Sequence, residues 1–106
     1  MLNIDLLPQP LSNDENGQKR CCLLQQTIDS GQMTEKELWF LYPADLPMPE
    51  DDDCDAYLLA TLLPAMQMRA AIHVYGSVSR ELLANLTELQ YVWNKWLPER
   101  YFLIDI

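Results

Sequence analysis

One segment constrains the fold more than any other: residues 70–106, where two apolar runs flank an amphipathic helical pattern. Within it, bulky apolar residues recur at spacings of four, three, four and three, which places them along one face of a helix. Ser79 precedes the pattern as a suitable N-cap, and Pro98 follows its end. The residues of this stripe are Leu82, Leu86, Leu89, Trp93 and Trp96.

The two flanking runs have the composition of buried strands. Residues 70–75 are short and partly β-branched, and residues 101–106 are apolar on both faces except at Asp105. We therefore expect a β-α-β unit with a right-handed crossover, closed by a strand that ends at Ile106. Chains commonly finish in a few loosely ordered residues, so a terminal strand suggests a segment of a longer protein.

The first third of the chain favours antiparallel strands. Apolar or alternating stretches at residues 2–7, 19–29 and 37–42 have the pattern of strands. A polar, turn-rich loop at 12–17 and a hairpin-type turn at 29–32 separate them. Two or three antiparallel strands are therefore expected.

An acidic connector rich in proline joins this region to the first predicted helix. Residues 43–53 contain three prolines and an acidic run, which resist both helix and central strand. Acidic side chains stand just before the apolar series that begins at Ala56, as expected at a helix N-terminus. The helix is predicted over 53–68, with Pro64 kinking or shortening it. The predicted fold class is thus α/β (α+β) in one domain over residues 1–106: antiparallel strands, then helix, strand, helix and strand in one mixed sheet.

The charge balance limits the partners. The chain carries 16 acidic and 7 scattered basic side chains, a net charge of −9, so binding to nucleic acid or to an anionic membrane is not expected. The longest apolar stretch, residues 56–68, is shorter than the roughly 20 residues that span a bilayer. The N-terminus lacks the pattern of a secretory signal. We expect a cytoplasmic protein whose three cysteines are reduced.

The turn between the predicted strand and helix, Gly76-Ser77-Val78-Ser79, is the most suggestive local feature. Free backbone N–H groups, the helix dipole and two hydroxyls converge there, so Gly76, Ser77 and Ser79 could bind phosphate or a carboxylate. One glycine matches neither a P-loop nor a dinucleotide-binding motif, and an ordinary helix cap explains the same residues.

The rest of the sequence contains no recognisable catalytic or metal-binding set, and no cofactor is indicated. His73 is the only histidine and lies in a predicted strand without an evident nucleophile or carboxylate beside it. The acidic residues at 50–55 lack the spacing and the glycine of an EF-hand, and solvated charge at a helix start explains them. Cys21 and Cys22 have no evident base, so both are expected in the core.

Aromatic residues suggest where a partner protein could bind. Trp39 and Tyr42 lie in a predicted strand with large groups on both faces, and such a strand needs a cover on both faces. They are therefore candidate interface residues. Trp93 and Trp96 continue the helical stripe, and we expect them in the core.

The order of several short motifs resembles a known class of protein. The motifs are Glu37-Leu38-Trp39-Phe40-Leu41-Tyr42-Pro43, Asp55-Ala56-Tyr57-Leu58-Leu59, Pro64-Ala65-Met66, Gly76-Ser77-Val78-Ser79, Leu82-Leu83, Asn85-Leu86, Trp96 and Pro98. Together, over residues 20–106, they resemble the N-terminal segment that precedes the nucleotide-binding domain in uncharacterised bacterial proteins of the PP-loop ATP-pyrophosphatase class, akin to asparagine synthase and 7-cyano-7-deazaguanine synthase-like enzymes. The Ser-Gly-Gly-x-Asp-Ser loop of that class is absent here, so the resemblance implies an accessory domain and carries over no catalytic residue.

Two functions from different classes are therefore expected. The first is a non-catalytic accessory or protein-interaction domain that packs on a neighbouring domain or on a second copy of itself. The alternative is a protein that binds a small molecule or a phosphate-type anion at the turn over residues 76–79. A small regulator, such as the antidote of a toxin system, fits the size and the acidity equally well.

Overall fold

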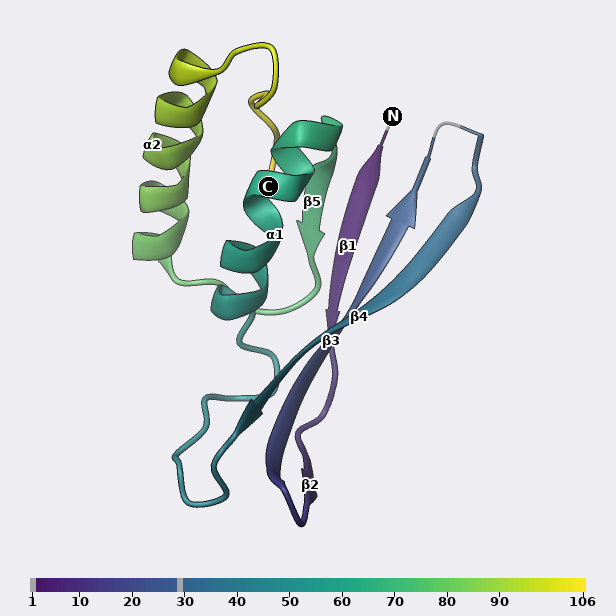
Figure 1. Ribbon diagram of the computed structural model, residues 1–106, viewed down its shortest axis with the longest axis vertical. Helices are drawn as coiled ribbons and strands as arrows, with labels where there is room; N and C mark the ends of the chain where they lie inside the picture. The colour runs from purple at the N-terminus through teal and green to yellow at the C-terminus, as the bar shows by residue number, and fades with distance from the viewer. Residues whose placement is uncertain (1, 29) are drawn as a thin grey trace.

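The computed structural model of the protein describes residues 2–28 and 30–106, which form five strands and two helices (Figure 1). Asp29, in the predicted turn at 29–32, lies outside the described residues. The α+β class with one mixed sheet is confirmed. In chain order the elements are β1 (Asn3–Pro8), β2 (Ser12–Asp14), β3 (Gly17–Thr27), β4 (Met33–Tyr42), α1 (Asp55–Met68), β5 (Ala71–Val74) and α2 (Arg80–Trp96).

Strand β3 is the centre of the sheet. One of its edges pairs antiparallel with β1 and with β2, and its other edge pairs antiparallel with β4. Strand β5 adds to the far edge of β1 in parallel, with Ile72 opposite Ile4. The loop predicted at 12–17 is therefore partly a strand, because Ser12–Asp14 pairs with the start of β3.

The core lies between one face of this sheet, here called the inner face, and α1. Alternation along β1 directs Ile4 and Leu6 to the inner face, where both are buried. Helix α1 lies over β1 and β5 (Figure 1). Each large apolar side chain that is fully buried contributes about 1.5–3 kcal/mol to stability. The largest fully buried side chains are Tyr57, Leu6, Leu58, Leu62, Met66, Ile72, Leu86, Cys22 and Cys54.

Helix α1 is not shortened by its proline. It begins at Asp55, two residues later than predicted, and runs through Pro64 to Met68. Pro64 cannot donate a hydrogen bond to the carbonyl of Ala60, but both residues are exposed, so water can satisfy that carbonyl. Arg69 follows in the left-handed conformation with φ 55° and returns the chain to β5.

Helix α2 has the predicted position, and most of its apolar stripe faces the core. Leu86 is buried and Trp93 is half-buried, but Trp96 is 67% exposed. The prediction that Trp96 lies in the core is therefore wrong. A helix turns once per 3.6 residues, so a stripe with a mean spacing near 3.5 rotates away from the core by about 20° every seven residues.

The last six residues do not form the predicted closing strand. Residues 101–106 run beside β5, and a single backbone hydrogen bond in the described chain joins the two, from the N–H of Ile72 to the carbonyl of Asp105 (2.9 Å). The side-chain carbonyl of Gln90 on α2 accepts the N–H of Ile104 (2.9 Å). This backbone group therefore bonds to a helix side chain instead of a strand.

The β3–β4 hairpin projects from the core. In Figure 1 its upper half extends to the right of β1, while both helices lie on the side of β1 and β5. The Cα radius of gyration is 14.9 Å, larger than the ~13 Å expected for a compact chain of this length. The hairpin is therefore the part of the fold that the helices cover least.

Candidate functional site

The turn at Gly76 is a site of close backbone approach. A Cβ atom at Gly76 would lie 2.3 Å from the carbonyl oxygen of Asp52 and 2.8 Å from Sγ of Cys54. Only glycine lets the acidic connector come this close, and a parallel bridge joins Asp53 to Ser77 just beside it. Gly76 therefore holds the connector against the start of α2.

The backbone N–H groups of both serines in this turn are already bonded within the chain. The N–H of Ser77 donates to the carbonyl of Asp52 (2.8 Å), and the N–H of Ser79 donates to the Asp55 carboxylate (2.8 Å). Ser79 Oγ accepts the N–H of Leu82 (3.2 Å) as the N-cap of α2. The anion at this helix N-terminus is thus the chain's own Asp55, and an external phosphate would have to displace it.

The buried thiols and the phenol of Tyr57 are not activated groups. Burial, reinforced by the neighbouring Cys54, raises the pKa of Cys22 to about 12. Burial also raises the pKa of Cys54 to about 11, with Asp53 adding to the shift. A thiol attacks as the thiolate, so these side chains are inert near neutral pH. The sequence prediction that Cys22 lies in the core is confirmed.

His73 does have a carboxylate beside it, contrary to the sequence analysis. Its Nδ1 lies 3.3 Å from Oδ1 of Asp5 on the neighbouring strand, and the imidazole is exposed. Residues 2–28 and 30–106 contain no group of three His, Cys, Asp or Glu side chains placed to hold a metal ion. No nucleophilic side chain stands with His73 and Asp5 among the described contacts, so we interpret the pair as a cross-strand contact between side chains and not as a catalytic site.

The two candidate interface residues lie on opposite faces of the sheet. Trp39 is 52% exposed on the outer face, the face that α1 does not cover, and Tyr42 is half-buried on the inner face. The ring of Tyr42 lies 6.4 Å from that of Phe40, which in turn stacks near Tyr57. Tyr42 therefore belongs to the margin of the core, and Trp39 remains available to a partner.

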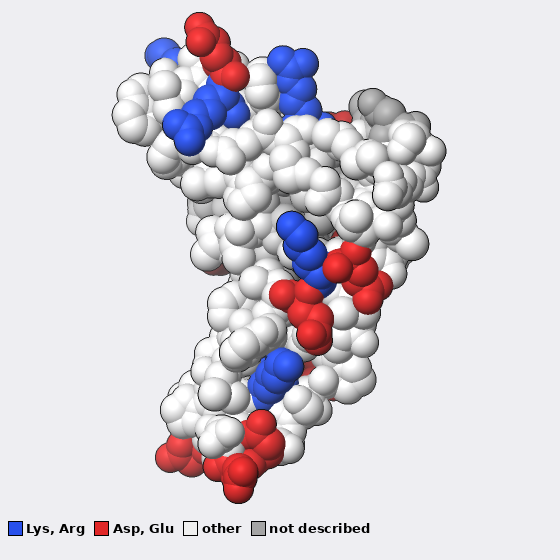
Figure 2. Space-filling model, turned by 45° about the vertical axis from the view of Figure 1, so that its right-hand side comes forward, with Lys and Arg blue, Asp and Glu red and all other residues white. Residues whose placement is uncertain are grey.

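The outer face of β4 carries five exposed side chains. Trp39 lies opposite Cys21 of β3, and Lys19 Nζ lies 5.2 Å from the centre of its ring, within the range of a cation–π contact. Figure 2 shows this side of the molecule, with broad uncharged surface between separate groups of charges. We call this set of side chains the hairpin surface; it consists of Met33, Glu35, Glu37, Trp39 and Leu41.

A small apolar groove separates α1 from the inner face of the hairpin. Its volume is about 170 Å³. On the side of α1 its lining includes two small or rigid side chains, Ala60 and Pro64, which leave space opposite the sheet. Further lining residues are Leu24, Lys36, Leu38 and Met68.

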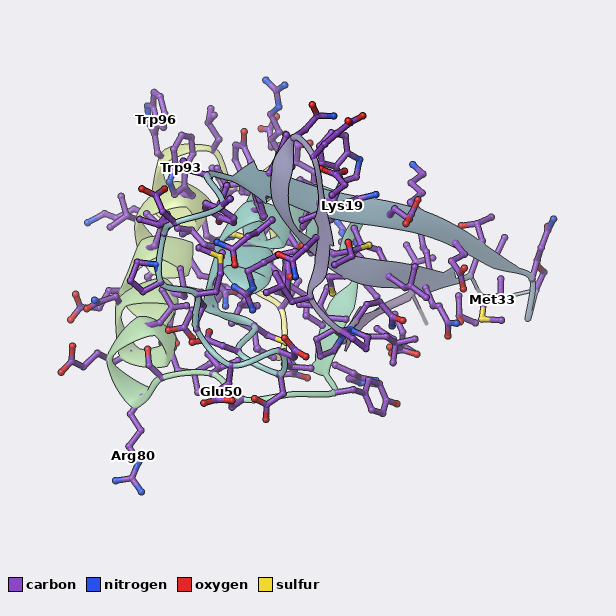
Figure 3. All side chains as sticks on the ribbon, turned by 90° about the horizontal axis from the view of Figure 1, so that it is seen from below. Lys19, Met33, Glu50, Arg80, Trp93 and Trp96 are labelled. Carbon is purple, nitrogen blue, oxygen red and sulfur yellow. The ribbon has the colours of Figure 1, made fainter. Side chains whose placement is uncertain are left out.

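A second apolar region lies on α2. Tyr91, Val92 and Trp96 are exposed along this helix. Figure 3 shows Trp93 and Trp96 at the same end of α2, with Trp96 pointing away from the molecule. Trp93 instead packs on Tyr101, with ring centroids 5.0 Å apart. A groove of about 340 Å³ between α2 and the end of the chain adjoins this region.

The comparisons with known proteins leave the family open. The chain matches no family model, curated protein or solved structure. Among the described residues, neither helix combines the length and the apolar character needed to cross a membrane. The function must therefore be inferred from the surfaces described above.

Sequence reasoning found Trp39 but missed most of the hairpin surface. The strand was predicted from residue 37 onward, so Met33 and Glu35 were not assigned to it, although β4 begins at Met33. The polar stretch before Glu37 has no apolar alternation, and only its pairing with β3 makes it a strand. The groove beside α1 could not be predicted, because it depends on the distance between elements.

Proposed function

We propose that the protein is a non-catalytic interaction domain that binds another protein through the hairpin surface. The observation that carries this proposal is the exposure of Trp39 and Leu41, 52% and 48%, on a strand that pairs on one edge only within the described sheet. A long edge strand with large apolar side chains is prone to pair with another chain, and Trp is favoured at the centre of protein interfaces. A stable partner would cover both features.

Catalysis and anion binding have less support. The thiols of Cys22 and Cys54 are buried, and burial keeps them protonated. The N–H groups of Ser77 and Ser79 are bonded to the chain's own oxygens. We therefore do not adopt the alternative of a phosphate site at the turn over residues 76–79.

Charge and thiol chemistry indicate the kind of partner and its setting. A net charge of −9 favours a basic or neutral protein over nucleic acid. The three free thiols suit the reducing cytosol, where we place the protein. Under the resemblance to PP-loop proteins, the partner would be a nucleotide-binding domain.

Site-specific crosslinking in cells tests the proposal. A photoreactive amino acid at Leu41 should crosslink to one protein, and the same group at Val92 on α2 serves as the matched control. The crosslinked protein is then purified and its affinity measured by calorimetry. We expect Trp39→Ala to weaken that affinity by at least about tenfold, since a central Trp is worth more than about 1.4 kcal/mol.

The control variants decide which surface binds. Val92→Ala on α2 should leave the affinity unchanged. If Val92→Ala or Trp96→Ala weakens binding and Trp39→Ala does not, the partner binds the apolar region of α2 and the proposed surface is wrong.

A further inference from the structure

Within the part of the chain that the structure describes, the outer edge of β4 carries a regular row of backbone groups that pair with no other strand. In antiparallel pairs, successive residues direct their N–H and C=O groups alternately toward the partner and away from it. The N–H of Ile28 donates to the carbonyl of Gln32 (3.1 Å), which fixes the phase of this alternation at the hairpin tip. Even-numbered residues of β4 therefore bond to β3, and odd-numbered ones, including Glu35, Glu37 and Trp39, direct their groups to the free edge.

The free edge of β4 is ten residues long. Within residues 2–28 and 30–106, β4 pairs with β3 alone. Edge strands are usually blocked by proline, by a bulge, by short length or by charged side chains, and of these β4 has only the charges at residues 35–37. The register of β4 against β3 runs without interruption from Met33 to Tyr42, and the strand contains no proline. Another strand could therefore pair along its whole length.

The two faces of β4 differ in the side chains that they offer to an added strand. On the outer face Glu35 and Glu37 stand two residues apart, next to Trp39. On the inner face lies the groove of about 170 Å³, whose lining includes Leu38 of β4 and Pro64 of α1. Residues of an added strand alternate between these faces, so its outer side chains meet carboxylates and its inner ones meet the apolar groove.

Charge argues against a second copy of the protein as that strand. A copy would bring its own Glu35 and Glu37 to the same edge, together with a further net charge of −9. Like charges that face one another across paired strands are destabilising. Lysine or arginine at those positions would instead pair with the carboxylates, and their cations could stack on Trp39 as Lys19 does.

We propose that β4 binds an extended segment of a basic protein, which adds to the sheet as a further strand. Its Lys or Arg side chains alternate with apolar ones: the basic side chains lie against Glu35 and Glu37, and the apolar ones close the groove beside α1. The inference rests on the proposed interaction through the hairpin surface, and it specifies the partner's backbone geometry and charge pattern.

Synthetic peptides test the charge pattern with the full chain. The probe is a ten-residue peptide in which Lys alternates with Val. The controls are its Glu–Val counterpart and a scrambled peptide of the same Lys and Val content. We expect the Lys–Val peptide to bind at least about tenfold more tightly than either control at low salt, and less tightly as salt rises. Equal affinity for the three peptides overturns the proposal.

Backbone methylation tests strand addition without altering the protein. Two Lys–Val peptides carry N-methyl groups on alternate residues, one on every Lys and the other on every Val. Only one of these two sets of N–H groups can face β4, so one peptide should lose binding by at least tenfold and the other should retain it. Equal affinity of the two peptides contradicts the proposal.

Two variants of the protein provide the reciprocal test. Glu37→Pro removes a free-edge N–H without removing a backbone bond to β3, and it also removes the carboxylate that accepts a hydrogen bond from Sγ of Cys21 (3.3 Å). Glu37→Gln removes the charge and keeps a side-chain oxygen that can accept the same bond. We expect the Pro variant to bind the Lys–Val peptide at least about tenfold more weakly than the Gln variant. Circular dichroism checks that both variants are folded. If the Pro variant is unfolded, the N-methylated peptides, which use the unaltered protein, test strand addition in its place. If all peptides fail while the crosslinked partner still requires Trp39, strand addition is wrong and the interaction domain stands.

Discussion

At the scale of single residues, Tyr57 shows how the core tolerates one unfavourable group. Its side chain is fully buried, and its hydroxyl has no hydrogen-bond partner in the described protein. The ring compensates through its contacts: it stacks near Phe40, and the guanidinium of Arg20 lies 5.2 Å from its centre. Arg20 is itself held by the carbonyls of Glu50 and Asp53. The ring therefore contributes to the core, while the hydroxyl costs stability.

Removing the hydroxyl of Tyr57 should stabilise the protein. Tyr57→Phe keeps the ring contacts and removes a buried polar atom without a partner, so we expect the free energy of unfolding to rise by about 1 kcal/mol. Urea unfolding followed by fluorescence measures the change. The matched control is Tyr101→Phe, because Tyr101 Oη accepts a hydrogen bond from Gln67 (3.2 Å) and its loss should cost about 0.5–1.5 kcal/mol. A larger loss for Tyr57→Phe than for the control would show that the hydroxyl is bonded in solution.

At the scale of elements, the turn before α2 ties together parts of the chain that are distant in sequence. The side chain of Ser79 caps α2, and its backbone N–H donates a hydrogen bond to the carboxylate of Asp55 at the start of α1. Gly76 lets the connector pass within bonding distance, so that Cys54 N–H donates to the Ser77 carbonyl (2.8 Å). The turn that suggested a ligand site in the sequence is therefore a structural junction between two helices.

Replacing Gly76 should loosen this junction. In Gly76→Ala the new methyl group would meet backbone and sulfur atoms at 2.3 and 2.8 Å, so we expect a loss of about 2–3 kcal/mol in the free energy of unfolding. Gly31→Ala is the control: its φ of +83° disfavours alanine, but among the described residues no atom other than those of its chain neighbours lies within 4 Å of the added Cβ, so its cost should be about 1–2 kcal/mol. Urea midpoints at matched slopes compare the two. A smaller effect at Gly76 than at Gly31 would contradict the close approach.

The sequence predicted correctly an element, helix α2, whose position is determined by local signals such as apolar periodicity and an N-cap residue. The stripe from Leu82 to Trp93 and the cap at Ser79 fix α2, and the structure confirms its position. Residues 101–106 have an apolar strand composition, but Asn94 and Gln90 on α2 bond to the backbone of Tyr101 and Ile104. These contacts cross from a helix to the end of the chain, and no local pattern encodes them.

The binding surface was less predictable than the helices and strands, because it depends on which faces and edges of the sheet the rest of the chain leaves exposed. Trp39 and Tyr42 were grouped by their proximity in the sequence, yet their odd and even positions place them on opposite faces. The open edge of β4 depends on the strand order, which the sequence alone did not specify. Of the residues that form the hairpin surface, the sequence therefore predicted Trp39 alone.

At the scale of the whole molecule, the titratable groups of the core act together. Cys22, Cys54 and Tyr57 are all fully buried within the same hydrophobic cluster. Burial raises the pKa of Cys22 to about 12, that of Cys54 to about 11 and that of Tyr57 to about 12. In the unfolded chain the thiols ionise near pH 9 and the phenol near pH 10. Alkaline pH therefore favours the unfolded chain, which loses these protons first.

The protein should consequently lose stability between about pH 9 and pH 12. Each group with a raised pKa contributes to the free energy of unfolding, and this contribution is fully present below the pKa of the group in the unfolded chain. It is lost as the pH rises through the pKa of the group in the folded protein. The free energy of unfolding falls by up to about 1.4 kcal/mol per pH unit for each group. Urea unfolding at a series of pH values measures the decline. Cys54→Ala should make the slope between pH 9 and 11 shallower, whereas Leu58→Ala should lower stability by about 2–5 kcal/mol and leave the slope unchanged. Equal slopes for both variants would show that the buried thiol does not govern alkaline unfolding.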